Sequence, residues 1–133
     1  MANYILHARD IMQVEVATIL GDMTVSEAAA LMRFEGVRSL LIERRTPDDP
    51  YGIITYSDIV HKVLAEGYDP ELIEVSRIMT KPLITLSPDL KVEYIARLFK
   101  QSGIGHAPVM DEDKVIGIVS MTDLVTEVIT EVE

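Results

Sequence analysis

The sequence has no cysteine, and this absence limits how the chain can be stabilised and what it can bind. Without thiols it has neither a disulfide framework nor a thiolate metal site, and it suits a reducing compartment. Two of its three histidines, His7 and His61, have no partner at metal-ligand spacing. We therefore expect no transition-metal site.

Basic residues are also scarce. There are 12 Lys and Arg against 22 Asp and Glu, which gives a formal net charge of −10. Nucleic-acid binding requires a basic face that neutralises phosphates, and little beyond Arg44-Arg45 offers one. We expect no DNA or RNA partner. A small anion held by backbone N–H groups remains compatible with an acidic protein.

Long apolar runs are missing as well. No uninterrupted apolar stretch approaches the roughly 20 residues of a membrane span. The N-terminal sequence MANYILHARDIM lacks a basic start followed by an apolar run, so it does not predict a signal peptide. We expect a soluble, cytoplasmic protein with no membrane partner.

Catalytic motifs are absent too. The chain has no Walker loop, no GxGxxG phrase and no recognisable arrangement of a nucleophile with a base. Its clustered acidic residues fall in predicted turns and helix starts. We therefore expect no enzymatic activity and no catalytic cofactor.

The feature that the chain does have is an internal repeat. Residues 52–60 are GIITYSDIV and residues 117–125 are GIVSMTDLV. A shift of 67 places residues 10–43 on 77–110 with eight of 34 pairs identical. A shift of 65 places residues 52–64 on 117–129 with five of 13 identical. Two copies of one unit explain this pattern.

Each copy predicts the order strand, helix, strand, strand, helix. The boundaries that we expect are repeat 1 at residues 1–66, a linker at 67–76 and repeat 2 at 77–133. A unit of about 60 residues buries little core by itself, so we expect the repeats to pack sheet to sheet around one shared core. The predicted class is therefore α/β (α+β) with pseudo-twofold symmetry.

Local signals set the ends of the predicted helices. Thr24-Val-Ser-Glu27 matches a capping box, and Gly36 and Gly103 stand where the following helices should stop. Ser57 and Thr122 are expected to be the N-caps of the two closing helices. Short first strands are expected in Val16–Leu20 and Leu83–Leu86.

The order of elements and three motifs resemble the cystathionine-β-synthase-type (CBS) domain, here as a tandem pair or Bateman module. The motifs are Ile78-Met79-Thr80, Gly105-His-Ala-Pro-Val109, and the closing phrase that ends in Asp58 and Asp123. The resemblance covers nearly the whole chain. It implies a regulatory module that binds an adenosine-containing ligand, such as AMP, ADP, ATP, NAD or S-adenosylmethionine, in clefts between the repeats.

The resemblance also implies two sets of binding residues, in which the motif Asp holds the ribose hydroxyls and the Thr or Ser lies beside phosphates. A carboxylate is suited to accept hydrogen bonds from two vicinal hydroxyls. The set of repeat 2 is Ser120, Asp123, Thr122, Lys81, Pro82, Leu83, His106, Ala107 and Pro108. The set of repeat 1 is Thr55, Asp58, Ser57, Val14, Val16, Arg38, Ser39 and Leu40.

The second set is expected to be the better site, because Pro108 keeps the family's proline where repeat 1 has Leu41. Simpler interpretations stand beside these. An Asp in the first helical turn is favoured by the helix dipole alone, and His106 could be a packing residue. The whole chain could also be a structural assembly module with empty clefts. The resemblance further implies a homodimer, formed through faces around Ile59–Leu64 and Leu124–Ile129, and a regulated partner of unknown identity.

Overall fold

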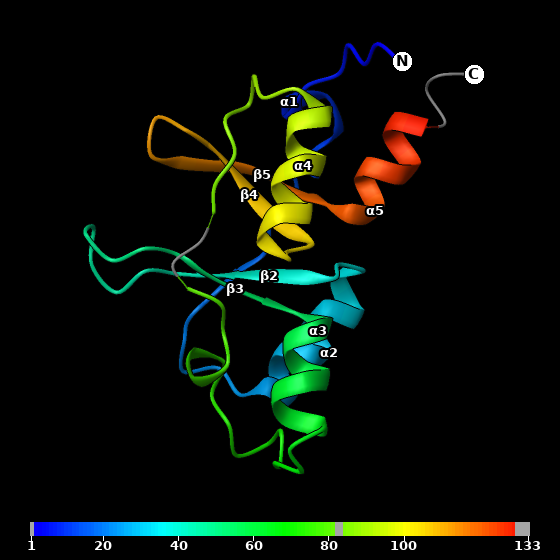
Figure 1. The fold of residues 1–133 in the computed structure, drawn as a ribbon. Helices are drawn as coiled ribbons and strands as arrows, with labels where there is room; N and C mark the ends of the chain where they lie inside the picture. The colour runs from blue at the N-terminus through cyan, green and yellow to red at the C-terminus, as the bar shows by residue number, and fades with distance from the viewer. Residues whose placement is uncertain (1, 82–83, 130–133) are drawn as a thin grey trace. The chain divides into compact units, whose positions relative to one another are not determined.

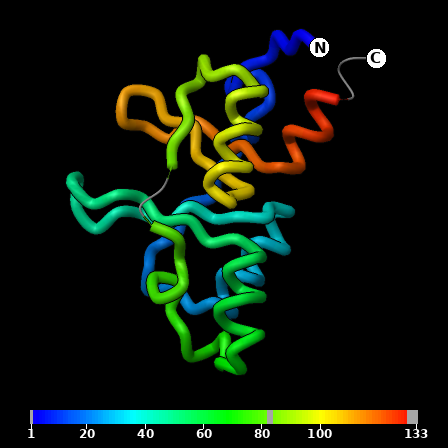
Figure 2. The backbone as a smooth tube through the Cα atoms, viewed as in Figure 1, coloured from blue at the N-terminus to red at the C-terminus, as the bar shows by residue number. Residues whose placement is uncertain are grey.

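The computed structural model describes residues 2–81 and 84–129, and within them it confirms the predicted α+β class (Figure 1). The chain divides into two compact units. The central unit is Ala17–Leu83, and the terminal unit combines Met1–Val16 with Ile84–Glu133. In Figure 2 the blue N-terminal segment runs beside the yellow-to-red part of the chain, with which it forms the terminal unit.

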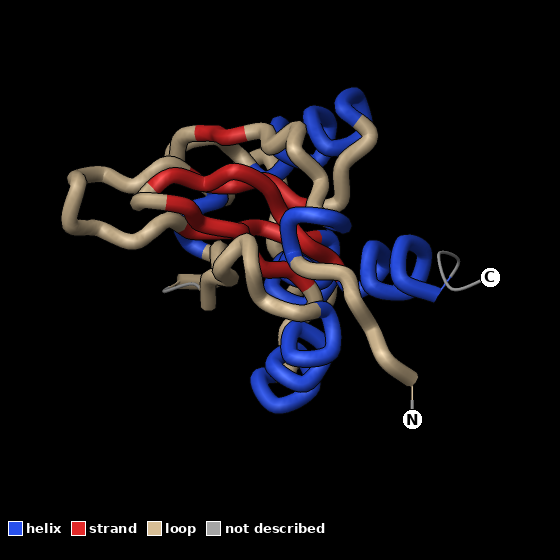
Figure 3. The backbone as a smooth tube through the Cα atoms, turned by 90° about the horizontal axis from the view of Figure 1, so that it is seen from above, coloured by secondary structure: helices blue, strands red, loops and turns tan. Residues whose placement is uncertain are grey.

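The central unit contains a three-stranded sheet in the order β1-β2-β3. Strand β1 pairs in parallel with β2, which pairs antiparallel with β3. Figure 3 colours the strands red, the helices blue and the loops tan. The elements are β1 (Thr18–Ile19), α2 (Val25–Glu35), β2 (Ser39–Ile42), β3 (Gly52–Thr55), α3 (Tyr56–Ile59), the π-helical segment η1 (Val60–Leu64) and the 3₁₀ turn η2 (Val75–Arg77).

The terminal unit repeats this plan around the antiparallel pair β4-β5. The predicted ends of its long helix and of the matching helix α2 are confirmed, since Gly36 and Gly103 are left-handed C-caps. The elements are α1 (Ala8–Ile11), α4 (Val92–Ser102), β4 (His106–Asp111), β5 (Lys114–Ser120), α5 (Met121–Asp123) and the π-helical segment η3 (Leu124–Ile129).

The first strand of each repeat is shorter than expected, and in repeat 2 it is reduced to one bridge. Leu86 pairs in parallel with Val109, whereas Leu83 lies outside the described residues. The cause is Pro108. Its counterpart Leu41 donates its backbone N–H to the Ala17 carbonyl over 3.0 Å, a bond that a proline cannot make.

The two compact units do not coincide with the two sequence repeats, because each repeat contributes a leading segment to the other unit. We call residues 8–13 and 75–80 the leading segments. Gln13 exchanges backbone hydrogen bonds of 2.9 and 3.0 Å with Ile118 in the terminal unit. Thr80 does the same with Ile53 in the central unit, over 2.9 and 3.2 Å. Each leading segment thus extends the edge of a sheet built mainly from the other repeat.

The described residues form two buried clusters, one in each unit, and the expectation of a core shared between the repeats stays a prediction. The exchange explains why each unit has a core of its own. Val75 and Ile78 of the second leading segment pack in the central core, and Ala8 and Ile11 of the first pack in the terminal core. How the two repeats pack against each other stays a prediction.

A methionine from each leading segment packs against a glycine that begins the repeated phrase. A Cβ atom added at Gly117 would lie 2.6 Å from Met12 Sδ and 3.0 Å from the Gln13 carbonyl oxygen. A Cβ added at Gly52 would collide with Met79 Sδ. Both glycines are buried within their strands, so the repeated glycine is required by close packing rather than by a turn.

Replacing either glycine should therefore overpack its unit. We expect Gly117→Ala and Gly52→Ala each to lower the free energy of unfolding by about 1–3 kcal/mol. Thermal unfolding followed by circular dichroism measures the effect. Gly105→Ala is the matched control, because an added Cβ there meets only ordinary contacts, the nearest being Met121 Cγ at 3.6 Å. Equal losses in all three variants would contradict the packing explanation.

Candidate functional site

The hydroxyl and the carboxylate of each repeated phrase form a helix cap. Thr55 and Ser120 are the N-cap residues, and Asp58 and Asp123 stand at the third helical position of capping boxes. Each Asp backbone N–H donates to the hydroxyl oxygen over 3.2 Å, and the cap backbone N–H donates back to the carboxylate. The prediction that Ser57 and Thr122 are the N-caps is wrong. A capping box needs the hydroxyl three residues before the carboxylate, and Ser57 and Thr122 come one residue before it.

In the terminal unit, the carboxylate of Asp123 is buried, with the residue 5% exposed. Its Oδ2 accepts hydrogen bonds from the Ser120 backbone N–H at 2.8 Å and the Ser120 hydroxyl at 2.9 Å. Its Oδ1 accepts one from the side-chain amide of Gln13 at 3.0 Å. All the hydrogen-bond donors to this carboxylate among the described residues are neutral groups.

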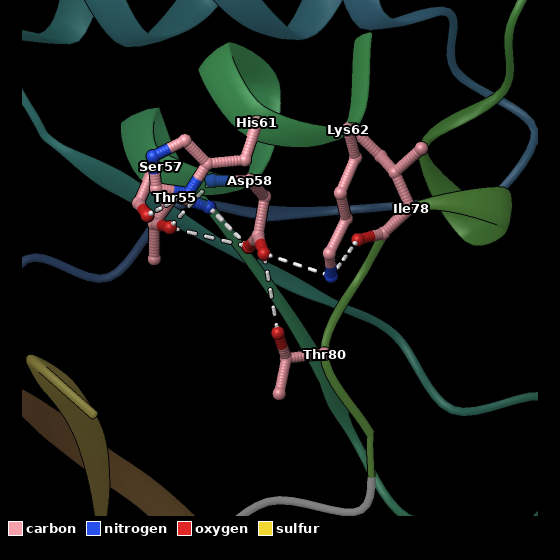
Figure 4. A network of polar contacts seen from close by, with 7 residues as sticks. All are labelled: Thr55, Ser57, Asp58, His61, Lys62, Ile78 and Thr80. Carbon is pink, nitrogen blue, oxygen red and sulfur yellow. Dashed lines mark hydrogen bonds and ion pairs between the residues drawn. The ribbon is translucent and has the colours of Figure 1, made fainter. Parts of the chain in front are cut away.

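In the central unit, Asp58 is 8% exposed and has a richer set of partners, drawn in Figure 4. Its Oδ2 accepts from the Thr55 backbone N–H at 3.0 Å and the Thr55 hydroxyl at 3.2 Å. Its Oδ1 accepts from the Thr80 hydroxyl at 3.3 Å and lies 3.0 Å from the Lys62 ammonium. The same ammonium donates to the Ile78 carbonyl at 2.9 Å, so Lys62 joins α3 and η1 to the leading segment of repeat 2.

The structure places the middle strand beside each cap, as expected for the predicted sites. Ser39 faces Thr55 across β2 and β3, and His106 faces Ser120 across β4 and β5. His106, Ser120 and Asp123 therefore belong to one neighbourhood of the terminal unit. Ser39, Thr55 and Asp58 form the equivalent neighbourhood of the central unit.

The other predicted residues are distributed less simply. Leu40 and Ala107 belong to the hydrophobic cores, so any contact that they make with a ligand would use backbone atoms. Pro108 is buried as well, whereas five further members are wholly or partly exposed: Val14, Val16, Arg38, Ser57 and Thr122. Pro82 and Leu83 lie outside the described residues. Both predicted sets are divided between the units, because Val14 and Val16 fall in the terminal unit and Lys81 in the central one.

Lys81, expected in the second site, is held by an acidic partner in the long turn of repeat 1. Its Nζ lies 2.8 Å from Asp49 Oδ2 and 2.7 Å from Asp49 Oδ1. Hydrogen bonding to Lys81, followed by the Arg45 backbone N–H, lowers the pKa of the Asp49 carboxyl from its ordinary value. The charge of Lys81 is therefore largely balanced within the central unit.

Sequence reasoning missed the three side chains that contact the motif carboxylates from outside the phrase: Gln13, Thr80 and Lys62. A signal for two of them was present. Gln13 and Thr80 each follow the repeated Ile-Met pair, at equivalent positions under the shift of 67. Lys62 follows its Asp by four residues, the spacing of neighbours on one helix face, whereas Glu127 occupies the equivalent position in repeat 2.

Other kinds of site find no support in the described part of the chain. Among residues 2–81 and 84–129, no group of three or more His, Asp or Glu side chains is placed to hold a metal ion. No described helix is both long and apolar enough to cross a membrane. The capped aspartates are therefore the main concentration of buried charge in the described residues.

The fold and the twice-used cap define a tandem-repeat α+β module of the CBS type. The CBS domain family matches the chain twice, at residues 8–65 and 75–130. The chain therefore belongs to the CBS domain family, as the sequence motifs predicted.

Three similar proteins illustrate this membership. The chain is 31% identical over 117 residues to the CBS domain-containing protein YhcV of Bacillus subtilis, covering 87% of this chain and 81% of the relative. It is 38% identical over 102 residues to an uncharacterized protein of Methanopyrus kandleri, covering 76% of this chain but only 52% of that relative. A hexameric CBS-CP12 protein from bloom-forming cyanobacteria has a similar structure, with a TM-score of 0.89, 45% identity, and coverage of 92% and 71%.

The assignment of the caps gives a direct test. We expect Ser120→Ala to lower the free energy of unfolding by about 1 kcal/mol, because it removes the N-cap oxygen and one donor to buried Asp123. Thr122→Ala, one residue from the carboxylate, should cost clearly less. Chemical denaturation of both variants measures the difference. A larger loss of unfolding free energy for Thr122→Ala than for Ser120→Ala would instead support Thr122 as the N-cap.

Proposed function

We propose that this protein is a regulatory module that senses an adenosine-containing ligand of the AMP, ADP, ATP, NAD or S-adenosylmethionine type. Its membership of the CBS domain family supports this proposal, and the surroundings of Asp123 carry it. The module acts without catalysis or a catalytic cofactor, in the cytoplasm, by passing a change in conformation to a partner. A ligand can drive such a change only by its differential affinity for the two states.

Asp123 has the properties of an acceptor for ribose hydroxyls. A carboxylate has about four acceptor positions on its two oxygens. Those on Oδ2 are occupied by the Ser120 backbone N–H and hydroxyl, whereas Oδ1 accepts only from the Gln13 amide among the described residues. Oδ1 therefore keeps an acceptor position for one ligand hydroxyl, and it gains a second if the neutral Gln13 amide moves away.

The capping geometry changes the role that Ser120 would have beside a phosphate. A serine hydroxyl has one proton, and Ser120 directs it to Asp123 Oδ2 at 2.9 Å. The hydroxyl oxygen meanwhile accepts from the Asp123 backbone N–H. In our proposal Ser120 fixes the carboxylate for the diol, and backbone N–H groups or basic side chains contact the phosphate.

We also propose that the protein self-associates, through a surface on its two closing helices, α3 with η1 and α5 with η3. Each helix carries an apolar stripe with a spacing of four residues, and the two stripes are equivalent under the shift of 65. The stripe residues are 48% to 61% exposed: Tyr56, Val60 and Leu64 on one helix, and Met121, Val125 and Ile129 on the other. Ile59, Val63 and Val128, which lie within the ranges first expected to form the contact, are instead buried in the cores.

The alternative is a structural assembly module whose caps bind no ligand. The apolar stripes favour it as much as they favour the sensor. A capping box is also sufficient to explain why a hydroxyl residue stands three positions before the Asp in each repeat. The two proposals differ in the role of Asp123 Oδ1. A cap requires only Oδ2, which accepts from the N-cap groups, whereas the sensor also uses Oδ1 to bind the ligand.

Ligand binding is tested by thermal unfolding with AMP, ADP, ATP, NAD, NADH and S-adenosylmethionine. A ligand at about 100 times its dissociation constant should stabilise the protein by about 2.7 kcal/mol, which is several degrees in Tm. Asp123→Ala should abolish the shift, because it removes the proposed diol acceptor. Asp58→Ala, which loses an equivalent cap, is the matched control and should keep it.

No shift from any of the six compounds would favour the assembly module. A shift abolished by Asp58→Ala and kept by Asp123→Ala would place the ligand at the other motif. Turnover of the bound nucleotide by the purified protein would contradict the non-catalytic part of the proposal.

The stripes are tested by light scattering after size-exclusion chromatography. We expect Val60→Glu and Val125→Glu together to reduce the oligomer to monomer, because each places a charge in a desolvated contact. Leu72→Glu, at an exposed apolar residue outside the stripes, is the control and should leave the mass unchanged. An unchanged mass in the double variant would show that self-association uses another surface.

A further inference from the structure

The two motif aspartates have the same cap but different occupancy of their acceptor positions. Asp58 receives the Thr55 backbone N–H and hydroxyl on Oδ2, and the Thr80 hydroxyl and Lys62 ammonium on Oδ1. These three hydrogen-bond donors and one ion-pair partner match in number the roughly four acceptor positions of a carboxylate. The Asp123 carboxylate accepts from three donors among the described residues: the Ser120 backbone N–H, the Ser120 hydroxyl and the Gln13 amide.

The extra donor at Asp58 comes from one residue. Lys62 lies four positions after Asp58 on the closing helix, and the equivalent position after Asp123 is Glu127. No described residue makes an ion pair with Asp123 that corresponds to the pair of Lys62 with Asp58. The leading-segment donors are matched, since Thr80 and Gln13 are equivalent, so Lys62 accounts for the difference.

Lys62 is also difficult for a sugar to displace. Its Nζ forms an ion pair of 3.0 Å with the buried Asp58 carboxylate, and the lysine side chain itself is 45% exposed. The same Nζ is anchored to the Ile78 carbonyl at 2.9 Å (Figure 4). The two ribose hydroxyls are neutral donors that need two acceptor positions. At Asp58 they would have to replace both the Thr80 hydroxyl and the Lys62 ion pair on Oδ1, whereas at Asp123 they would replace only the neutral Gln13 amide.

We propose that Lys62 closes the Asp58 motif to ribose-containing ligands, so that each chain binds one such ligand, at Asp123. The residue four positions after the motif aspartate thereby determines how many sites are open. This inference rests on the proposed function, and it adds the number of sites and the residue that sets it.

The test is calorimetric titration with AMP, with ATP and with S-adenosylmethionine. We expect one molecule per chain for the wild type and none for Asp123→Ala. Lys62→Met removes the ammonium and keeps an apolar stem, so it should raise the stoichiometry to two. The combination of Asp123→Ala with Lys62→Met should regain one site. Lys100→Met on α4 removes the same charge elsewhere and should leave one site.

Loss of the ion pair could impair folding, so Lys62→Gln provides a second variant. Its neutral amide can satisfy Asp58 as Gln13 satisfies Asp123, and it should also open the site. If the wild type binds one molecule per chain and both Lys62 variants also bind one, the inference is overturned and the proposed function stays intact. Two molecules on the wild type, or loss of binding on changing Lys62, would also overturn it. No binding of any of the three compounds by the wild type would instead contradict the proposed function.

Discussion

Each half of this protein is completed by a segment from the other repeat, and the fit of a methionine against a glycine fixes that segment in place. Met12 packs on Gly117, and Met79 packs on Gly52. A methyl group added at either glycine would force the methionine side chain to shift, and at Gly117 it would also press on the Gln13 carbonyl oxygen. The same segments supply Val75 and Ile78 to one core, and Gln13 and Thr80 to the two motif carboxylates. The sheet edges, the cores and the candidate site therefore depend on one exchange.

The exchange of leading segments gives the two units the same backbone arrangement around their caps. The Lys62 ammonium, which has no counterpart among the described residues of the terminal unit, makes the surroundings of the two aspartates differ. Burying a carboxylate is costly unless it is hydrogen-bonded, and both caps meet this requirement. In the central unit the burial is offset by an ammonium, and in the terminal unit by neutral donors alone. An ion pair suits a permanent structural element. Neutral donors that a ligand can replace at similar free energy suit a site whose occupancy changes.

Much of this could be predicted from the sequence, because repetition reveals which residues share a role. The repeated helix stops at Gly36 and Gly103 follow from local geometry that glycine satisfies best. The hydroxyl three residues before each Asp was visible too, although the caps were first assigned to Ser57 and Thr122. The exchange was not predictable in this way, since a repeat looks the same whether its leading segment packs on its own copy or on the other. The binding roles of the two residue sets remain predictions.

In our proposal the Asp123 carboxylate accepts the ligand's ribose hydroxyls on Oδ1, the oxygen that accepts from the Gln13 amide in this structure. The chain has three side-chain carboxamides, Asn3, Gln13 and Gln101, so their ¹⁵N–¹H signals are simple to assign. On titration with a nucleotide that stabilises the protein, we expect the Gln13 side-chain signals to move and those of Asn3 and Gln101 to stay. Saturation of the protein with ligand while the Gln13 side-chain signals stay unchanged would contradict this role of Asp123.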